Sequence, residues 1–292
     1  MPGSTGPLIP RRRLGATFRR LREEKDEQLK DTADALLFST SKLSRIETGV
    51  LEPQPRDLRD LLRYYDIENT DLGLEIQTWL TQAADQPWWS MRGFTPAPKL
   101  EEYLSHESPA ETIEEYLPLF VPGTMQTAEY AAAVLRGLNP RLSAKGTRRL
   151  VELRLARREF LDQRPSKPRL VSVVAEEVLH RVVGSPAVMR GQLESLLAEL
   201  ESDRHEFHVV PFEAGIYPAF EGSITIFTYA DPRDSSAVAI TSVSTTEFSV
   251  KSSVVADHRE RFDNLSDHWL APEATRGLIQ SLLGSEKFRP ER

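Results

Sequence analysis

The chain has 292 residues, of which 39% are hydrophobic and 28% charged, a composition typical of a globular protein with room for two domains. It contains no cysteine, which excludes disulfides, thiolate zinc sites and cysteine nucleophiles. No apolar run approaches the roughly 18 residues of a membrane span, and Met1–Pro10 has no secretory core, so we expect a cytoplasmic protein. The net charge of −7 is unusual for a nucleic-acid binder. DNA binding therefore requires that the basic residues cluster in one part of the chain.

The first basic residues follow a segment rich in proline, glycine and serine. Residues 1–13 are predicted to form a disordered basic arm that ends in Arg11, Arg12 and Arg13. Residues 11–30 hold eight basic and four acidic residues, so the start of this acidic chain is locally positive. Such an arm suits contacts with DNA phosphates, and a solvated arm that touches nothing is an equally weighted alternative.

Two helices are predicted in the first forty residues. Leu14, Phe18 and Leu21 follow the i, i+4, i+7 spacing of one helix face. Residues 32–37 supply the apolar face of a second helix. The chain between residue 37 and Ser39 is too short for anything but a tight turn.

A third helix is predicted from Ser39 to Gly49. The Ser39 side chain can accept a hydrogen bond from an unpaired amide of the first turn, and Gly49 can adopt the left-handed conformation that ends a helix. Leu43 and Ile46 share one face, which leaves a small, polar and cationic outer side. Helix, tight turn and polar second helix form the helix-turn-helix arrangement, and we favour it over an ordinary amphipathic helix in a bundle.

The outer side of the third helix is predicted to read DNA in the major groove. Short polar residues approach base edges closely there, and arginine or lysine donates to guanine O6 and N7. Ser44 is expected near a phosphate or a base edge. The predicted DNA-binding residues are Gln28, Lys30, Thr40, Ser41, Lys42, Ser44 and Arg45.

Residues 14–67 resemble the helix-turn-helix domain of the xenobiotic-response-element and phage-repressor class. The phrase Ser-Lys-Leu-Ser-Arg-Ile-Glu-Thr-Gly at 41–49 is similar to that of many actinobacterial members. The resemblance implies that Arg22 and Glu47 form a structural pair between the first and third helices. The chain departs from the family pattern at Glu27, Leu29 and Leu37, where an apolar residue, a phosphate-contacting glutamine and a glycine are common.

The spacing of apolar residues predicts two more helices, and prolines mark the domain boundary. Leucines at 58, 61 and 62 predict a fourth helix, and residues 72–83 a fifth. Prolines at 87, 96 and 98 mark a boundary, where Trp88 and Trp89 are expected to pack between domains rather than form an exposed docking patch. The predicted divisions are 1–13, a disordered basic arm; 14–84, the helix-turn-helix domain; 85–105, a linker; and 106–292, a regulatory and dimerisation domain.

The second half mixes helical and strand patterns without strict alternation. The predicted fold class is therefore an N-terminal all-α, five-helix domain followed by an α+β domain. Predicted helices cover residues 127–138, 148–163, 186–200 and 276–283. Predicted strands cover residues 170–174, 207–212, 223–229, 238–243 and 245–250.

This half also resembles a known family. The phrase Leu-Phe-Val-Pro-Gly-Thr-Met-Gln-Thr-Ala-Glu-Tyr at 119–130 is similar to a signature of a domain of unknown function in actinobacterial regulators, and residues 154–158 and 209–215 resemble its later landmarks. The resemblance implies an antitoxin-like transcriptional regulator with a small acidic partner protein. From the residues alone, 122–130 is a Pro-Gly turn followed by a helix capped at Thr127, which we favour over a ligand site.

No residue pattern supports an enzyme, a metal site or a cofactor. Glu176, Glu177 and His180 have Glu-x-x-His spacing, but the full zinc-hydrolase motif is absent. Residues Glu111, Glu114 and Glu115 are interpreted as a solvated face rather than a catalytic pair. No nucleophile elbow and no phosphate-binding glycine loop is found.

Three hypotheses remain, and the first is favoured. It is a sequence-specific DNA-binding regulator, modulated through its C-terminal domain by a small protein partner or a ligand. The second is an antitoxin-like interaction module that acts mainly through a small acidic partner protein. The third is an enzyme of unrecognised type. Because one helix-turn-helix reads few base pairs, a homodimer is expected.

Overall fold

The structure of the chain is a computed structural model that describes residues 6–201, 205–219, 221–242 and 245–288. It separates into two compact units. The first contains the residues up to Pro109 together with Asp231–Asp234, and the second contains Ala110–Ala230 and the residues from Ser235 onward. The first unit is all-helical and the second has a mixed sheet with helices, which confirms the predicted fold class.

The N-terminal unit is built from seven α-helices in its described residues. They are α1 (Leu8–Glu24), α2 (Leu29–Ala35), α3 (Thr40–Glu47), α4 (Pro55–Tyr64), α5 (Asp71–Ala83), α6 (Trp88–Met91) and α7 (Pro98–Glu107). The periodic apolar positions of α1, α3, α4 and α5 meet in one core, with Phe18, Leu43, Ile46, Leu61 and Ile76 fully buried. Burial of such side chains stabilises the unit by about 1.5–3 kcal/mol each.

The prediction of a disordered arm over residues 1–13 requires a correction. Residues 1–5 lie outside the described residues, but α1 already begins at Leu8. Pro10 is tolerated because it stands in the first turn, where a helix has no partner for its N–H groups. Arg11 donates to Glu52, with Nε 3.1 Å from Oε2, so part of the basic block serves the fold.

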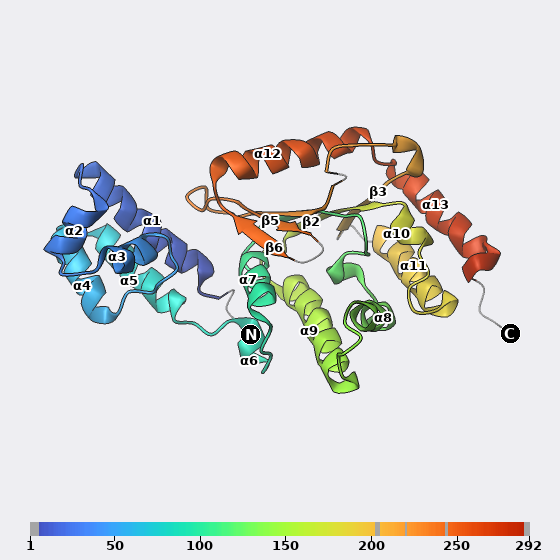
Figure 1. Cartoon of the computed structure of the whole chain (residues 1–292), viewed down its shortest axis with the longest axis horizontal. Helices are drawn as coiled ribbons and strands as arrows, with labels where there is room; N and C mark the ends of the chain where they lie inside the picture. Colours follow the sequence, from blue (N-terminus) through green and yellow to red (C-terminus); the bar gives the residue numbers. More distant parts are fainter. Residues whose placement is uncertain (1–5, 202–204, 220, 243–244, 289–292) are drawn as a thin grey trace. The chain divides into compact units, whose positions relative to one another are not determined.

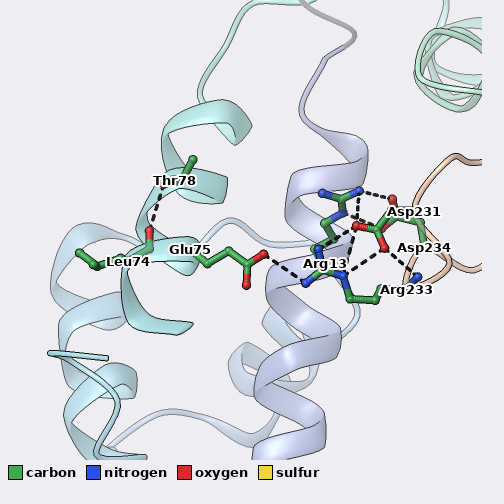
Figure 2. A network of polar contacts seen from close by, with 7 residues as sticks. All are labelled: Arg13, Leu74, Glu75, Thr78, Asp231, Arg233 and Asp234. Carbon is green, nitrogen blue, oxygen red and sulfur yellow. Dashed lines mark hydrogen bonds and ion pairs between the residues drawn. The ribbon is translucent and has the colours of Figure 1, made fainter. Parts of the chain in front are cut away.

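Arg13 is held by a segment that is distant in the sequence. Its guanidinium donates to both carboxylate oxygens of Asp234, at 2.8 and 2.6 Å, and lies 3.2 Å from Asp231 (Figure 2). Arg233 of the same segment lies 3.1 Å from Glu75 of α5 (Figure 2). The hydrogen bonds to Asp234 raise the pKa of Arg13. Asp231–Asp234 is thus a structural part of the N-terminal unit.

The predicted linker, residues 85–105, contains α6 and most of α7. Trp88 and Trp89 are each 1% exposed and meet edge to face, with their ring centroids 5.7 Å apart. The indole N–H of Trp88 donates to Ser108 Oγ at 2.9 Å. These residues belong to the N-terminal unit, while the division of the chain at residues 84 and 105 stays a prediction.

The C-terminal unit is organised around a six-stranded sheet in the order β3-β2-β1-β4-β5-β6. The strands are β1 (Thr112–Leu117), β2 (Arg169–Ala175), β3 (His205–Val210), β4 (Ser223–Thr228), β5 (Ala237–Thr241) and β6 (Thr246–Ser249). β1, β2 and β3 are parallel, and the remaining neighbours are antiparallel. In the register, Tyr116 lies between Val173 and Ile224.

Helices cover both faces of this sheet. They are α8 (Ala128–Leu138), α9 (Ala144–Gln163), α10 (Glu177–His180), α11 (Pro186–Leu200), α12 (Ser252–Asp263) and α13 (Pro272–Gly284). α12 lies on one face and α8 to α11 on the other (Figure 1). Side chains alternate accordingly: Val173 packs toward Phe262 of α12, while Val174 packs with Leu193 of α11. Within the described ranges, no helix is both long enough and apolar enough to cross a bilayer.

Three strands or α-helices of this unit were not predicted from the sequence: β1, the short helix α10 and α12. The interpretation of Glu114 and Glu115 as a solvated face is wrong, because they are only 8% and 5% exposed within β1. Glu114 pairs with Arg259 of α12, and Glu115 accepts a hydrogen bond from Ser172 Oγ at 2.7 Å. The buried carboxylate of Glu114 is thereby paired with a positive charge, and that of Glu115 accepts a hydrogen bond.

Candidate nucleic-acid interface

The turn between α2 and α3 is closed by two backbone hydrogen bonds. The amide of Leu37 donates to Asp34 at 3.2 Å, and that of Phe38 donates to Ala33 at 2.8 Å. Leu37 has a φ of 56°, in the left-handed region that glycine adopts at no steric cost. Its side chain is 93% exposed. The turn therefore forms without the glycine common at this position.

The predicted start and end of the recognition helix α3 are confirmed. Ser39 Oγ accepts a hydrogen bond from the amide of Lys42 at 3.1 Å, as an N-cap residue does. Gly49 has a φ of 72° just past the C-terminus. A Cβ at Gly49 would lie 3.1 Å from the Cα of Arg12, so the close approach of α1 also requires a glycine here.

α3 has a buried side and an open side. Leu43, Ile46 and Glu47 are buried, whereas Thr40, Ser41 and Arg45 are exposed and Ser44 is half-buried. Arg45 has no acidic partner among the described residues. A helix with short polar residues around one uncompensated arginine can approach base edges and phosphates.

Lys42 differs from Arg45 because it is engaged within the unit. Its Nζ lies 2.6 Å from Asp57 Oδ1 of α4 and 4.1 Å from the ring centroid of Phe38. Asp57 also accepts from the amide of Gln54 at 3.2 Å, as part of the cap of α4. Lys42 must leave or share this carboxylate to contact DNA, so it is a weaker candidate than Arg45.

The two candidates on α2 are both exposed. Gln28 precedes the helix as its N-cap residue but makes no capping hydrogen bond with its side chain. Lys30 lies in the first turn and, within the part of the chain that the structure describes, has no acidic partner. Both side chains are therefore available for phosphate contacts, which position a helix-turn-helix on the duplex.

Most of the remaining positive charge on α1 is compensated locally. Arg19 pairs with Glu23 at 2.9 Å and Arg20 with Glu24 at 2.8 Å, each with i, i+4 spacing. Exposed pairs of this kind contribute only about 0.3–0.5 kcal/mol. Glu23 and Glu24 are already subtracted in the net charge of residues 11–30. The positive charge that is free to meet DNA is lowered further because Arg11, Arg13 and Arg22 pair with carboxylates outside this stretch.

Arg22 and Glu47 form a two-pronged ion pair between α1 and α3. Arg22 Nε and Nη2 lie 2.8 and 2.9 Å from the two carboxylate oxygens, and the side chains are only 12% and 5% exposed. The hydrogen bond to Glu47 raises the pKa of Arg22. The pair faces the interior, so neither charge is presented to DNA.

The unusual Glu27 has a structural explanation. Its Oε2 accepts from Thr32 Oγ1 at 2.6 Å and from the hydroxyl of Tyr64 at 2.7 Å. These hydrogen bonds, that from Thr32 first, lower the pKa of Glu27. A carboxylate here joins α2 to α4, where the family pattern has apolar packing.

Gly15 is a further residue of the site, and its role was not predicted from the sequence. A Cβ at this position would lie 2.4 Å from the carbonyl oxygen of Ile46 and 2.7 Å from that of Glu47. The backbone of α1 therefore rests directly on the last turn of α3. The only signal in the sequence is a glycine between Leu14 and Phe18, two core positions of a helix.

The Glu-x-x-His residues of the C-terminal unit are used for packing. Glu176 Oε1 lies 2.9 Å from His180 Nε2, and its Oε2 accepts from the amide of Phe212 at 2.9 Å. His205 and His208 stand three residues apart in β3 and so point to opposite faces. Within the described residues, no group of three or more potential metal ligands is present.

The chain matches two known families. Residues 13–72 match the family described as "Helix-turn-helix domain". Residues 100–281, more than half of the chain, match the family described as "Domain of unknown function (DUF5753)". No curated protein and no solved structure matches the chain. The first match covers α1 to α4, the helices that position the polar face of α3.

Proposed function

Because the chain belongs to the family of the domain of unknown function DUF5753 and carries a helix-turn-helix domain ahead of it, we propose that it is a sequence-specific transcriptional regulator. The recognition helix α3 lies in the major groove of double-stranded DNA. The C-terminal unit modulates this activity by binding a small protein partner or a ligand. The resemblance of residues 41–49 supports assignment to the xenobiotic-response-element class.

The observation that carries the DNA-binding proposal is that Arg45, on the open side of α3, has no acidic partner among the described residues. Lys42 beside it, by contrast, is paired with Asp57. Arg45 is long enough for a bidentate contact with guanine O6 and N7. Thr40 and Ser41 precede it on the exposed N-terminal turn and are small enough to allow close approach. Lys30 and Gln28 would then contact phosphates.

Arg45→Ala is expected to weaken binding to the specific site by about 1–3 kcal/mol, or roughly 5-fold to 150-fold in Kd. The loss arises from a contact with one base pair, so discrimination at that pair should also relax. The sites would first be selected from a pool of random duplexes, and affinities then measured by fluorescence anisotropy. Each duplex would be titrated at several salt concentrations.

Arg63→Ala is the matched control, because Arg63 is an exposed arginine of α4 that already pairs with Glu68 at 3.2 Å. It removes the same charge and should leave base preference unchanged. If Arg45→Ala weakened specific and random duplexes equally, Arg45 would touch only phosphate. No binding by the wild-type protein to any duplex would contradict the whole proposal.

We also propose that the protein binds as a homodimer to an inverted repeat. One α3 reads only a few base pairs, and two half-sites one helical turn apart supply the missing specificity. The long helices α9 and α11 of the C-terminal unit are the proposed source of the contact. Sedimentation of the full chain should give a dimer with and without duplex. A full-length monomer on a single half-site would contradict this.

The second candidate is an antitoxin-like interaction module that acts by binding a small acidic protein. The resemblance of residues 119–130 favours it. The selection from random duplexes separates this candidate from the DNA-binding regulator, because a module that binds only protein would enrich no DNA sequence. Unchanged partner binding together with weakened DNA binding in Arg45→Ala would show that both activities are present.

A further inference from the structure

The loop before α8 brings several polar groups to one side of α9. It contains the short 3-10 helix η1 (Gly123–Met125) and ends at Gln126, which is 5% exposed. Gln126 Nε2 donates to the carbonyl of Val121 at 2.6 Å, and the amide of Val121 donates to the hydroxyl of Tyr130 at 3.3 Å. The loop is therefore held in a defined shape by its own buried groups.

Arg154 of α9 points into this arrangement. Its Nη1 donates to Gln126 Oε1, and this neutral amide is its one hydrogen-bond partner within the described ranges. Burial, and next the charge of Arg157, lower the pKa of Arg154 to about 10. An arginine with a normal environment stays far above this value. Arg154 is thus half-buried, and the described residues place no negative charge against its guanidinium.

Arg157 lies near Arg154, since its charge lowers the pKa of Arg154, and Arg181 lies near Tyr130. A Cβ at Gly123 would lie 3.0 Å from Arg157 Nη1, so the guanidinium of Arg157 rests against the loop where a side chain would displace it. Arg181, which follows α10, is exposed and has no acidic partner in the part of the chain described here. Burial raises the pKa of Tyr130, while the charges of Arg181 and Arg154 act in the opposite direction.

Arg158 of the same helix, by contrast, has acidic partners. Arg158 pairs with Glu199 and lies 3.9 Å from Asp162. A buried charge without a partner destabilises the fold, and a well-placed, hydrogen-bonded opposite charge offsets that cost. Arginine presents its donors in a planar fork that matches the oxygens of a carboxylate or a phosphate.

We propose that Arg154, with Arg157 near it, forms a binding site for the oxyanion of a small molecule, a carboxylate or a phosphate group. The ligand's oxygens supply the negative charge that the described residues do not place next to Arg154. Gln126 orients the guanidinium, and the loop over residues 121–126 forms the wall of the site. α8, α9 and α10 lie on the same side of the sheet (Figure 1). The proposal stands whether or not the protein binds DNA.

The test is the thermal stability of the full-length protein in Tris chloride with added sodium phosphate, sodium acetate or sodium chloride at equal ionic strength. A ligand that binds only the folded state raises its stability. At 20 mM, phosphate or acetate should raise Tm of the C-terminal unit by at least ~3 °C over chloride. The more effective ion tells a phosphate site from a carboxylate site.

Arg154→Gln should abolish this increase, and in chloride it should melt no lower than the wild type, because it removes an uncompensated buried charge. Arg154→Lys keeps the charge without the fork and should retain only part of the increase. Arg148→Gln is the matched control, since Arg148 is an exposed arginine of α9. It should retain the whole increase.

Three outcomes would overturn the proposal. If phosphate or acetate raised the Tm of Arg154→Gln as much as that of the wild type, the increase would be a general effect of the salt on stability. A lower Tm for Arg154→Gln in every salt, with no anion response in the wild type, would mean that Arg154 only supports the loop. A response to a hexaglutamate peptide, with none to phosphate or acetate, would assign the site to an acidic protein segment instead.

Discussion

Gly15→Ala is expected to destabilise the N-terminal unit by about 1–3 kcal/mol or more and to abolish DNA binding, because the new methyl group meets the backbone of the recognition helix. The added Cβ would lie 2.4 Å from the carbonyl oxygen of Ile46, far inside van der Waals contact. A backbone carbonyl at a helix end cannot rotate away as a side chain can. Helix propensity opposes this effect, since alanine is favoured over glycine by roughly 0.5–1 kcal/mol. The steric clash is expected to cost more free energy than the gain in helix propensity supplies.

Gly137→Ala provides the control for Gly15→Ala. Gly137 lies in α8, and a Cβ there would meet no atom within 4 Å. This variant should gain roughly 0.5–1 kcal/mol from helix propensity alone. Differential scanning calorimetry of both variants, together with duplex binding, gives the comparison. If Gly15→Ala melted like the wild type and bound DNA, α1 would not rest on α3 as described.

Glu47→Ala is expected to lower the stability of the N-terminal unit by about 3–5 kcal/mol. It leaves the guanidinium of Arg22, which is 12% exposed, without the carboxylate that holds it at 2.8 and 2.9 Å. The hydrogen bond of Arg22 to the carbonyl of Glu27 remains but supplies only a neutral acceptor. The Tm of the full-length protein, measured in the absence of DNA, reports this loss directly.

Glu23→Ala is the matched control for Glu47→Ala. Glu23 pairs with Arg19 at 2.9 Å, but both side chains are more than half exposed. Its removal should change stability by less than about 0.5 kcal/mol. Similar small effects from both variants would show that the Arg22–Glu47 pair contributes nothing to stability.

The helical half of the fold could be predicted because its signals are local. Ser39, the Leu43 and Ile46 spacing, and Gly49 are all within one short stretch, and the structure uses each as expected. β1 was missed because Glu114 and Glu115 interrupt its apolar pattern. Glu115 accepts a hydrogen bond from Ser172, and Glu114 pairs with Arg259, both of which are distant in the sequence. Periodicity carries no information about such partners.

In the candidate DNA-binding site, too, local features could be predicted from the sequence and contacts between distant residues could not. The exposure of Arg45 follows from helix geometry, since it lies opposite Leu43 and Ile46. The pairing of Lys42 with Asp57 joins two helices, and no spacing rule predicts it. Arg154 also looked like any other residue of an arginine-rich helix. Only the structure shows that its neighbours within the described residues supply an amide instead of a carboxylate.

The position of Asp231–Asp234 in the N-terminal unit has a consequence for biosynthesis. Arg13 and Asp234 are 221 residues apart in the sequence, yet they form a two-pronged ion pair. At about 5–20 residues per second, a ribosome needs roughly 10–45 s to make the chain between them. The helices α1 to α7 can pack long before this, but Arg13 waits for its partners until the strands β1 to β4 have been synthesised. A nascent chain that stops before residue 231 therefore carries a helix-turn-helix unit that is still incomplete.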